Sequence, residues 1–324
     1  MRRMAKGFAA PRRYRAAPRK DLSAKSSYIE PMDNRAAPDA LANAPTAHGL
    51  RGDYSAMRPD WTVAQPVETY TAADHALWRR LYERQTKLVT DYAAPVFVKS
   101  LRDMECADGI PDIEKLSTRL RKATGWEIVC VPGLLPNDVF FDHLANRRFP
   151  ASWWIRKPEE IDYLVEPDVF HDVFGHVPLL FDQVFADYLQ QYGLGGPKAI
   201  AHDAVDILAR LYWYMVEFGL IMTEDGVKAY GAGMLSSFGE TQFSIDDPAP
   251  NRIGFDLERV MNTRYWIDRY QSTYFVLPSF EKLFRDSIDT DFGPLYERIK
   301  SMDPHAPDAV LESDLVIHRG TGKA

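Results

Sequence analysis

The chain has 324 residues, of which 46% are hydrophobic and 12% aromatic, enough for one large domain or two small ones. Its net charge of -7 argues against nucleic acid as the main partner, and no apolar run approaches the roughly 18 to 20 residues that span a bilayer. Its two cysteines, Cys106 and Cys130, form no CxxC pair, and no apolar signal core follows the basic N-terminus. We expect a globular protein of the cytoplasm.

The N-terminal region differs from the rest of the chain. Residues 1–25 hold nine Lys or Arg and one Asp, whereas the remaining residues hold 30 basic and 45 acidic side chains. Up to residue 66 the sequence is rich in Ala, Pro and Arg and shows no sustained helical or strand period. We therefore predict a flexible basic arm over residues 1–66. A role of this arm in phosphate binding, nucleic-acid binding or targeting stays open.

Helices dominate the pattern from residue 67 onward. A long helix is predicted to begin in "TYTAADHALWRRLYERQTKLVTDYAAPVFVKSL", and further helices are predicted in "IPDIEKLSTRLRKATG", in "NDVFFDHLANRRF", at Pro158, after Pro167, over residues 198–222 and in "FEKLF". Extended segments are predicted in "WEIVCVPGLL", "SWWIRK" and "VKAYGAG". No repeat and no βαβ alternation is present. We predict a mainly α fold with a small β component, with a single domain over residues 67–290 and a short tail over residues 291–324 without a tetramerisation helix.

Two histidines lie five residues apart in "EPDVFHDVFGHVPLLF", residues 166–181. On an ideal α-helix a five-residue step turns about 500°, so His171 and His176 would point roughly 140° apart. They converge only if the helix stops between them, and Gly175 followed by Pro178 predicts such a stop. Chelation of one ion by both imidazoles is then possible.

A single carboxylate interrupts the apolar helix predicted over residues 198–222. Glu217 is the only charged side chain in "LYWYMVEFGLIM", and an ionised carboxylate that is buried without a partner is strongly destabilising. The charge of Glu217 would be compensated if its side of the helix faced solvent or if an Arg side chain paired with it. Alternatively, helical spacing places Trp213 and Tyr214 beside Glu217 in a pocket wall, where a metal-binding carboxylate belongs.

Two neutral imidazoles and one carboxylate form a three-ligand face that leaves the opposite positions of a metal open. This donor set suits Fe(II) and dioxygen chemistry. A hydrolytic zinc site also uses two His and one Glu, but its HExxH signature is absent. The residues favour iron and leave a zinc hydrolase, with Asp172 or Glu240 as base, as an alternative.

Three segments resemble the pterin-dependent aromatic amino acid hydroxylases, namely "PDVFHDVFGHVPLL", "LYWYMVEFGL" and "KAYGAGMLSSFGE". The likeness runs from about residue 67 to 290 and is strongest to the bacterial members that act on phenylalanine. It implies a mainly helical catalytic domain in which His171, His176 and Glu217 hold one non-haem Fe(II). It also implies a monooxygenase that converts L-phenylalanine to L-tyrosine with dioxygen and a tetrahydropterin. Tryptophan hydroxylation within the same family, or a binding module that has lost catalysis, are the alternatives.

The resemblance assigns roles to further residues. Arg156 matches the arginine that binds the amino acid carboxylate, and Glu240 matches an acid that braces it. Tyr212 matches a tyrosine close to the iron. The implied substrate-binding residues are Arg156, Trp213, Gly233, Ser236, Ser237 and Glu240, one of the two serines bonding toward an iron-binding histidine. The implied pterin-binding residues are Gly133, Leu134, Leu135, Phe140, Asp172 and Tyr212.

The sequence departs from the animal members of this family. They carry Glu at the position of Asp172 and Thr at that of Leu164, so contacts to the pterin and the amino acid are expected to differ. They also carry a regulatory domain and a tetramerisation helix, which the arm and the tail do not resemble. The resemblance therefore implies a monomer.

Overall fold

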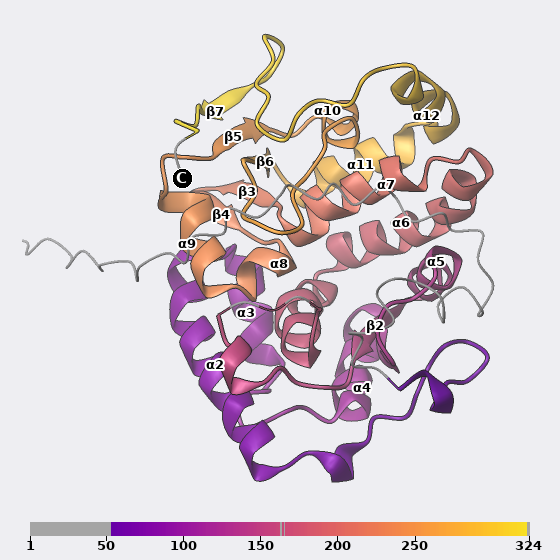
Figure 1. Ribbon diagram of the computed structural model, residues 1–324, viewed down its shortest axis with the longest axis vertical. Helices are drawn as coiled ribbons and strands as arrows, with labels where there is room; N and C mark the ends of the chain where they lie inside the picture. The colour runs from indigo at the N-terminus through magenta and orange to yellow at the C-terminus, as the bar shows by residue number, and fades with distance from the viewer. Residues whose placement is uncertain (1–52, 163, 165, 323–324) are drawn as a thin grey trace, which may run out of the picture. The chain divides into compact units, whose positions relative to one another are not determined.

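The computed structural model describes residues 53–162, 164 and 166–322 (Figure 1). The predicted basic arm lies outside the described residues over positions 1–52. Among the described helices, none combines the length and the apolar character that a membrane crossing needs.

The described chain is mainly α-helical with a small β component, which confirms the predicted fold class. Its α-helices are α2 (Ala72–Tyr92), α3 (Pro95–Asp103), α4 (Ile113–Thr124), α5 (Asn137–Ala145), α6 (Gln183–Ala201), α7 (Val205–Tyr212), α8 (Ala232–Leu235), α9 (Phe238–Asp246), α10 (Leu257–Met261), α11 (Phe280–Asp289) and α12 (Phe292–Lys300). Its strands are β1 (Glu127–Val131), β2 (Arg148–Ser152), β3 (Leu220–Thr223), β4 (Gly226–Ala229), β5 (Asn251–Gly254), β6 (Thr273–Leu277) and β7 (Val316–His318). Short 3-10 segments are η1 (Tyr54–Ala56), η2 (Val67–Thr69), η3 (Pro158–Glu160) and η5 (Val177–Phe181), and π-helical segments are η4 (His171–His176) and η6 (Trp213–Glu217).

Helix boundaries follow local signals in the sequence. Helix α2 begins after Thr71, whose side chain and that of Asp74 bond to each other's backbone N–H in a capping box. It ends before Pro95, which disfavours helical backbone in the preceding residue and itself opens α3. Helix α4 begins after Asp112, whose carboxylate accepts from two backbone N–H groups, and ends at Gly125 in the left-handed conformation with a φ of 79°.

The strands form two sheets. Strands β1 and β2 are parallel, with Glu127 opposite Arg148 and Val131 opposite Ser152. The other sheet has the order β4-β3-β6-β5-β7. In it, β6 runs parallel to both β3 and β5, whereas β4 and β7 are antiparallel to their neighbours. Strands β3 and β4 follow each other closely in the sequence, whereas the other neighbouring strands of this sheet are separated by longer stretches of chain.

The helix predicted over residues 198–222 is wrong. Helix α6 ends at Ala201, Asp203 adopts a φ of 49° in the turn, and α7 starts a new helix. After Glu217 the chain leaves the helical conformation and forms β3. Strands β3 and β6 are short apolar runs, and periodicity alone does not distinguish such a run from a buried helix, whereas β5 carries no apolar run at all. The sequence predicts only β1 and β4.

Close helix packing supports the region around the site. Helix α6 contacts both α5 and α11 (Figure 1). Glycines allow the approach of α5, because a Cβ added at Gly193 would lie 2.4 Å from the backbone nitrogen of Ala145.

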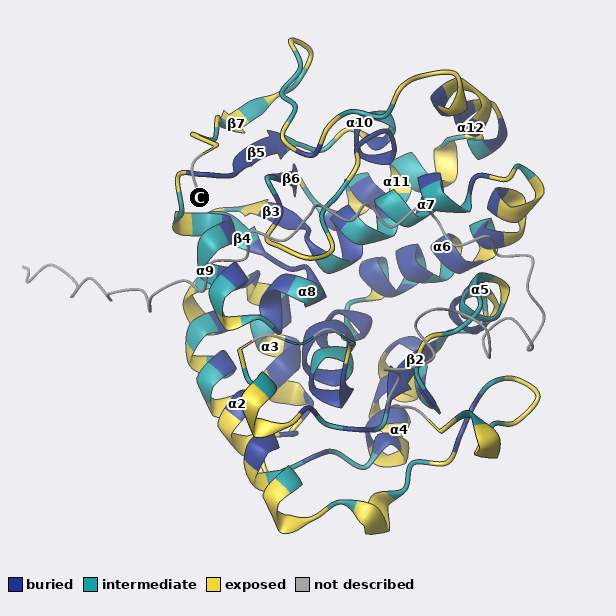
Figure 2. Ribbon diagram, viewed as in Figure 1, coloured by how far each residue is buried: buried dark blue, intermediate teal, exposed yellow. Residues whose placement is uncertain are grey.

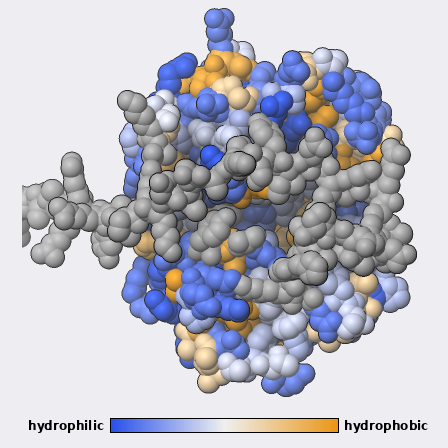
Figure 3. Space-filling model, viewed as in Figure 1, coloured by the Kyte–Doolittle hydropathy of each residue, from blue (hydrophilic) through white to orange (hydrophobic). Residues whose placement is uncertain are grey.

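Figure 2 shows buried positions along one side of α2 and exposed positions along the other. On the face drawn in Figure 3, hydrophilic residues cover much of the described surface and hydrophobic residues form separate patches.

Described residues beyond the predicted domain limits of 67 and 290 also belong to the fold. In the segment before residue 67, the backbone N–H of Val63 donates to the carbonyl of Cys130 at 2.8 Å. After residue 290, α12 contacts α6, and β7 pairs with β5. The folded unit therefore extends past both predicted limits, because backbone hydrogen bonds attach these flanking segments to it.

Candidate metal centre and substrate site

His171 and His176 lie at the two ends of the π-helical segment η4. In a π-helix, backbone hydrogen bonds link residues five apart, so the side chains of residues i and i+5 lie on the same side of the helix. The predicted helix stop at Gly175 is therefore wrong, because the helix widens instead of ending. Gly175 serves close packing, since a Cβ there would lie 2.8 Å from the carbonyl oxygen of Ala232. Pro178 lies in the first turn of η5, where a missing N–H is tolerated.

Glu217 is the last residue of the π-helical segment η6, where the chain turns toward β3. Two glycines pack closely around it. A Cβ added at Gly231 would lie 2.4 Å from the backbone oxygen of Glu217. A Cβ added at Gly233 would lie 3.3 Å from Glu217 Oε2, so the chain after β4 packs directly against this side chain.

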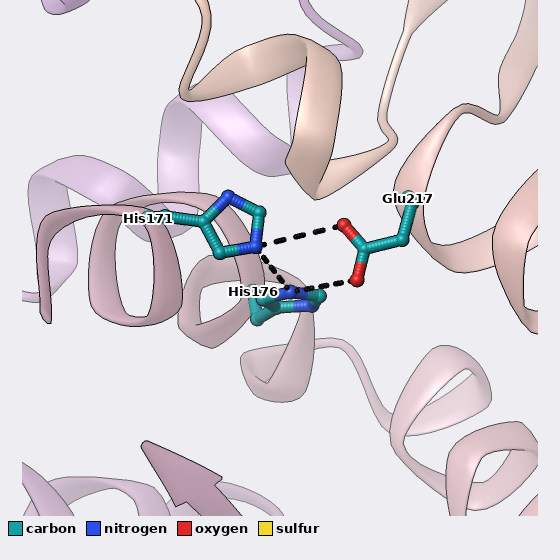
Figure 4. A group of neighbouring side chains, drawn as sticks. All are labelled: His171, His176 and Glu217. Atoms are coloured by element: carbon teal, nitrogen blue, oxygen red, sulfur yellow. Dashed lines mark hydrogen bonds and ion pairs between the residues drawn. The ribbon is translucent and has the colours of Figure 1, made fainter. Parts of the chain in front are cut away.

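The three predicted ligands point at one another from η4 and η6 (Figure 4). His176 Nε2 lies 3.2 Å from His171 Nε2 and 3.2 Å from Glu217 Oε1, and His171 Nε2 lies 3.6 Å from Glu217 Oε2. Adjacent ligands of an ion bound at about 2.1 Å lie roughly 3.0 to 3.5 Å apart. In the part of the chain that the structure describes, these side chains form the one group of at least three His, Cys, Asp or Glu with donor atoms within 4.8 Å of one another. The donor set therefore has the spacing that a single metal ion requires.

Ser236 fixes the orientation of His171. Its Oγ lies 2.8 Å from His171 Nδ1 and donates to the carbonyl of Ala232 at 2.9 Å. Because the hydroxyl hydrogen of Ser236 is donated to Ala232, Ser236 Oγ accepts a hydrogen bond from Nδ1–H, and the lone pair of His171 lies on Nε2. That nitrogen is the one that faces Glu217. The expectation that one of the two serines bonds toward a metal-binding histidine falls on Ser236.

The electrostatics of the centre depend on burial and on the carboxylate. Burial lowers the pKa of His171 to about 4, which keeps its imidazole neutral. For His176, burial opposes protonation, but the charge and hydrogen bond of Glu217 outweigh it and raise the pKa. For Glu217, burial is likewise outweighed by the two histidines, so its pKa is lowered and it stays ionised. The centre therefore offers a negative oxygen between two imidazole nitrogens.

Arg156 lies buried beside this centre. Its Nε and Nη2 donate to Asp168 Oδ2 and Oδ1 at 2.9 and 2.8 Å. Asp168 also accepts from the backbone N–H of Arg156 at 2.9 Å and of His171 at 3.0 Å. The prediction that Glu240 braces Arg156 is wrong, because Asp168 occupies that position. Asp168 ties Arg156 to the first residue of η4.

Glu240 has other partners in the described chain. Its Oε1 accepts from the hydroxyl of Tyr274 at 2.8 Å and from the backbone N–H of Gln271 at 3.2 Å. Burial raises the pKa of Glu240 to about 7. Ser237 caps α9, with its Oγ accepting from the backbone N–H of Glu240. Glu240 therefore anchors the segment before β6 to the start of α9.

The aromatic residues near Glu217 point in two directions. Trp213 stacks on Tyr265 with ring centroids 4.4 Å apart. The sequence predicts Tyr214 beside Glu217, but its ring packs edge-on against Phe275 at 4.9 Å. The difference arises because η6 is π-helical and shifts each side chain relative to an α-helix.

The predicted pterin loop follows β1 and is contacted by the N-terminal described segment. A Cβ added at Gly133 would lie 2.9 Å from the hydroxyl of Tyr54, and that hydroxyl donates to the carbonyl of Leu134 at 3.2 Å. The side chain of Leu134 is exposed and that of Leu135 is half-buried. The loop is thus held by its backbone, while its apolar side chains remain partly accessible.

The other predicted pterin residues contact one another, strand β2 or a metal-binding histidine. Phe140, on α5, meets Tyr212 edge-on with centroids 5.5 Å apart, and the ring of Tyr212 lies 6.4 Å from that of His176. Asp172 Oδ2 accepts from the backbone N–H and the hydroxyl of Ser152, each at 2.7 Å. Burial raises the pKa of Asp172 to about 7 and that of Tyr212 well above its usual value.

Sequence reasoning missed several residues that shape the site. Asp168 accepts a bond from the backbone three residues ahead, which is the spacing of a helix cap, so "DVFH" carries a usable signal. Ser152 and Tyr54 contact residues 20 and 80 positions away. No local pattern predicts such contacts.

Comparison with known proteins identifies the family. The family model described as biopterin-dependent aromatic amino acid hydroxylase matches residues 53–292. A phenylalanine-4-hydroxylase of Ralstonia nicotianae is 54% identical over 276 residues, which cover 85% of this chain and 87% of that protein. A phenylalanine-4-hydroxylase of Chromobacterium violaceum is 55% identical over 262 residues, which cover 81% of this chain and 88% of that protein. The chain belongs to the biopterin-dependent aromatic amino acid hydroxylase family, a family of oxidoreductases.

A solved structure supports the same assignment. The iron- and phenylalanine-bound crystal structure of phenylalanine hydroxylase from Chromobacterium violaceum aligns with a TM-score of 0.77 and 52% identity, covering 86% of this chain and 100% of that chain. The resemblance predicted from the three sequence segments is thereby confirmed, together with the mainly helical catalytic fold.

Proposed function

We propose that this protein is a phenylalanine 4-monooxygenase, which hydroxylates L-phenylalanine to L-tyrosine with dioxygen and a tetrahydropterin. The relatives at 54% and 55% identity are named phenylalanine-4-hydroxylase. One observation carries the proposal: in a chain of this family, the donor atoms of His171, His176 and Glu217 meet within 4.8 Å of one another.

His171, His176 and Glu217 are proposed to hold one Fe(II). Two imidazole nitrogens and one carboxylate oxygen match the donor set preferred by non-haem Fe(II) sites that use dioxygen. A relative that is 52% identical has been solved with iron bound. When bound, the iron and the reduced pterin together supply the activation that dioxygen needs to react with an aromatic ring.

Arg156 is proposed to bind the substrate carboxylate. Asp168 takes the Nε–Nη2 edge of its guanidinium, so we assign the edge through Nη1 to the amino acid. The ion pair between Arg156 and Asp168 also places the guanidinium beside His171, because Asp168 accepts hydrogen bonds from Arg156 and from the backbone of His171. We place the aromatic ring of the substrate near Trp213. The further proposed substrate residues are Gly233, Ser236, Ser237 and, behind the pocket wall, Glu240.

The pterin is proposed to lie between the loop after β1 and helix α5. Phe140 offers a ring face, and the backbone of the loop offers polar groups along the ring edge. Tyr212 acts as a neutral hydroxyl that positions its neighbours, since its raised pKa keeps the proton on the phenol. The proposed pterin residues are Gly133, Leu134, Leu135, Phe140, Asp172 and Tyr212.

Aerobic turnover tests the proposal. Fe(II)-loaded protein supplied with phenylalanine and a tetrahydropterin is expected to form tyrosine and to consume both substrates. Glu217→Gln and His171→Ala are expected to abolish tyrosine formation while the far-ultraviolet dichroism stays unchanged, because each removes a metal ligand and leaves the fold. Normal turnover by metal-free His171→Ala would contradict the proposal. Preferential hydroxylation of tryptophan in a parallel assay would favour the sister activity instead.

Three further expectations stay proposals. The catalytic site is proposed to lie within residues 67–290, to which the described segments before residue 67 and after residue 290 are attached, with a basic arm before it and a short tail after it. A cytoplasmic location is supported by the two free cysteines, Cys106 and Cys130, whose burial raises each thiol pKa to about 12. A monomeric state is proposed as well, and sedimentation of the full chain would check it.

A further inference from the structure

Gln85 is a buried residue of α2 that contacts the backbone of the site from a distant part of the sequence. It is 1% exposed. Its Nε2 donates to the carbonyls of Leu235 and Ser237 at 2.7 and 3.3 Å, and lies 3.2 Å from Thr241 Oγ1. The two carbonyls belong to the residues on either side of Ser236. An amide 150 positions away therefore grips the chain around that serine.

The two carbonyls lie at helix ends. That of Leu235 closes the single-turn helix α8 and has no partner within it, whereas that of Ser237, at the start of α9, also accepts from the backbone N–H of Thr241 at 3.2 Å. Buried carbonyls without a partner are rare, since each loses its bond to water. Thr241 Oγ1 lies 2.7 Å from the carbonyls of both Met234 and Ser237. Gln85 and Thr241 thus satisfy the carbonyls that surround Ser236 and leave its backbone little freedom.

Ser236 passes this constraint to the metal centre. Its Oγ accepts from His171 Nδ1 at 2.8 Å. We infer that Gln85 is a positioning residue of the centre: by holding the carbonyls beside Ser236 it sets the place of Ser236 Oγ and, through it, the ring of His171. The inference rests on the proposed function, in which His171 binds the metal.

Cobalt(II) binding tests the inference without turnover. The dissociation constant and the visible absorption bands of bound cobalt are measured for the wild-type protein, Gln85→Met, Ser236→Ala and the double variant. Methionine retains the length of glutamine and removes the amide. We expect Gln85→Met to shift the bands and weaken binding about 3- to 10-fold, less than the roughly 10- to 100-fold typical for losing a direct partner of a metal-bound histidine. When Gln85→Met is added to Ser236→Ala, we expect no further loss of cobalt affinity, because Gln85 acts on the metal centre through Ser236.

A matched control separates positioning from stability. Ser117 is 0% exposed, and its Oγ bonds to the backbone N–H and carbonyl of Ile128 at 2.9 and 3.2 Å, joining α4 to β1. Ser117→Ala also removes buried hydrogen bonds. It is expected to lower the melting temperature while leaving the cobalt dissociation constant and bands unchanged.

Two results would overturn the inference while the proposed function stands. One is that Gln85→Met weakens cobalt binding by the same factor in the wild-type protein and in Ser236→Ala. The other is a lowered melting temperature of Gln85→Met with an unchanged dissociation constant and unchanged bands. Failure of the wild-type protein to bind cobalt would remove the metal centre itself. If Gln85→Met does not fold, Gln85→Asn replaces it with the same expectations, because it withdraws the amide by one methylene.

Discussion

Glu240 is a buried acid whose proton couples pH to stability. Burial raises its pKa to about 7 from the usual value of 4.5, so the native state retains a proton that the unfolded chain releases between about pH 4.5 and 7. The unfolded state then binds fewer protons than the native state, and the free energy of unfolding falls as pH rises through that window. Above about pH 7 Glu240 is ionised in both states, and this penalty to the free energy of unfolding has reached its full size.

Glu240→Gln removes this penalty and retains an oxygen that accepts from Tyr274 and Gln271. We expect the variant to match the wild-type protein near pH 4.5 and to exceed its free energy of unfolding by up to about 3 kcal/mol at pH 8. Urea unfolding of chelated protein at several pH values measures the difference. A difference that does not change between pH 4.5 and 8 would show that Glu240 is not protonated in the native state.

Residue identities were predictable where the chemistry of the side chain is specific. Two histidines and one isolated carboxylate indicate the metal-binding donor set by their residue types alone. The partner of Arg156 was not predictable, because Asp168 and Glu240 are both acids and only the fold decides which one reaches the guanidinium. Choosing between them required distances that sequence spacing does not set.

Gly175 controls the distance between η4 and α8. Alanine there would place a Cβ 2.8 Å from the carbonyl oxygen of Ala232, and a backbone atom yields only if the segment moves. We expect Gly175→Ala to lower the free energy of unfolding by about 1 to 3 kcal/mol and to weaken cobalt binding, because α8 leads into Ser236. Urea unfolding and cobalt titration measure the two effects.

Gly195 supplies the control for this substitution. It lies within α6, and an added Cβ would meet no atom within 4 Å. Gly195→Ala is expected to raise the free energy of unfolding by about 0.5 to 1 kcal/mol, because alanine favours the helix, and to leave cobalt binding unchanged. Equal changes in the free energy of unfolding and in cobalt affinity for Gly175→Ala and Gly195→Ala would mean that contact with Ala232 does not limit the packing.

Elements with local signals were predicted and elements set by tertiary contacts were not. The starts of α2 and α4 follow from Thr71 and Asp112, whose side chains cap their own helices. The π-helical segments η4 and η6 have no such signal in the sequence. An α-helical interpretation of residues 171–176 therefore separates the two histidines, whereas the π-helix brings them together.

At the scale of the whole molecule, the site depends on the order in which distant segments meet. The sheet order β4-β3-β6-β5-β7 places strands together that are far apart in the chain. Strand β3 begins at Leu220, shortly after Glu217, and β6 carries Tyr274, whose hydroxyl donates to Glu240. The sequence patterns predict a mainly helical domain, but pairing of buried strands is a non-local property that hydrophobic periodicity does not encode.

The central claim is that His171, His176 and Glu217 hold one ferrous ion, and anomalous diffraction tests it most directly. Crystals of the full chain grown anaerobically with Fe(II) would be measured on both sides of the iron absorption edge. We predict one strong iron peak bonded to both Nε2 atoms and to the carboxylate at about 2.1 Å, which is lost in Glu217→Gln. Iron bound elsewhere, with these three side chains free of it, would contradict the account.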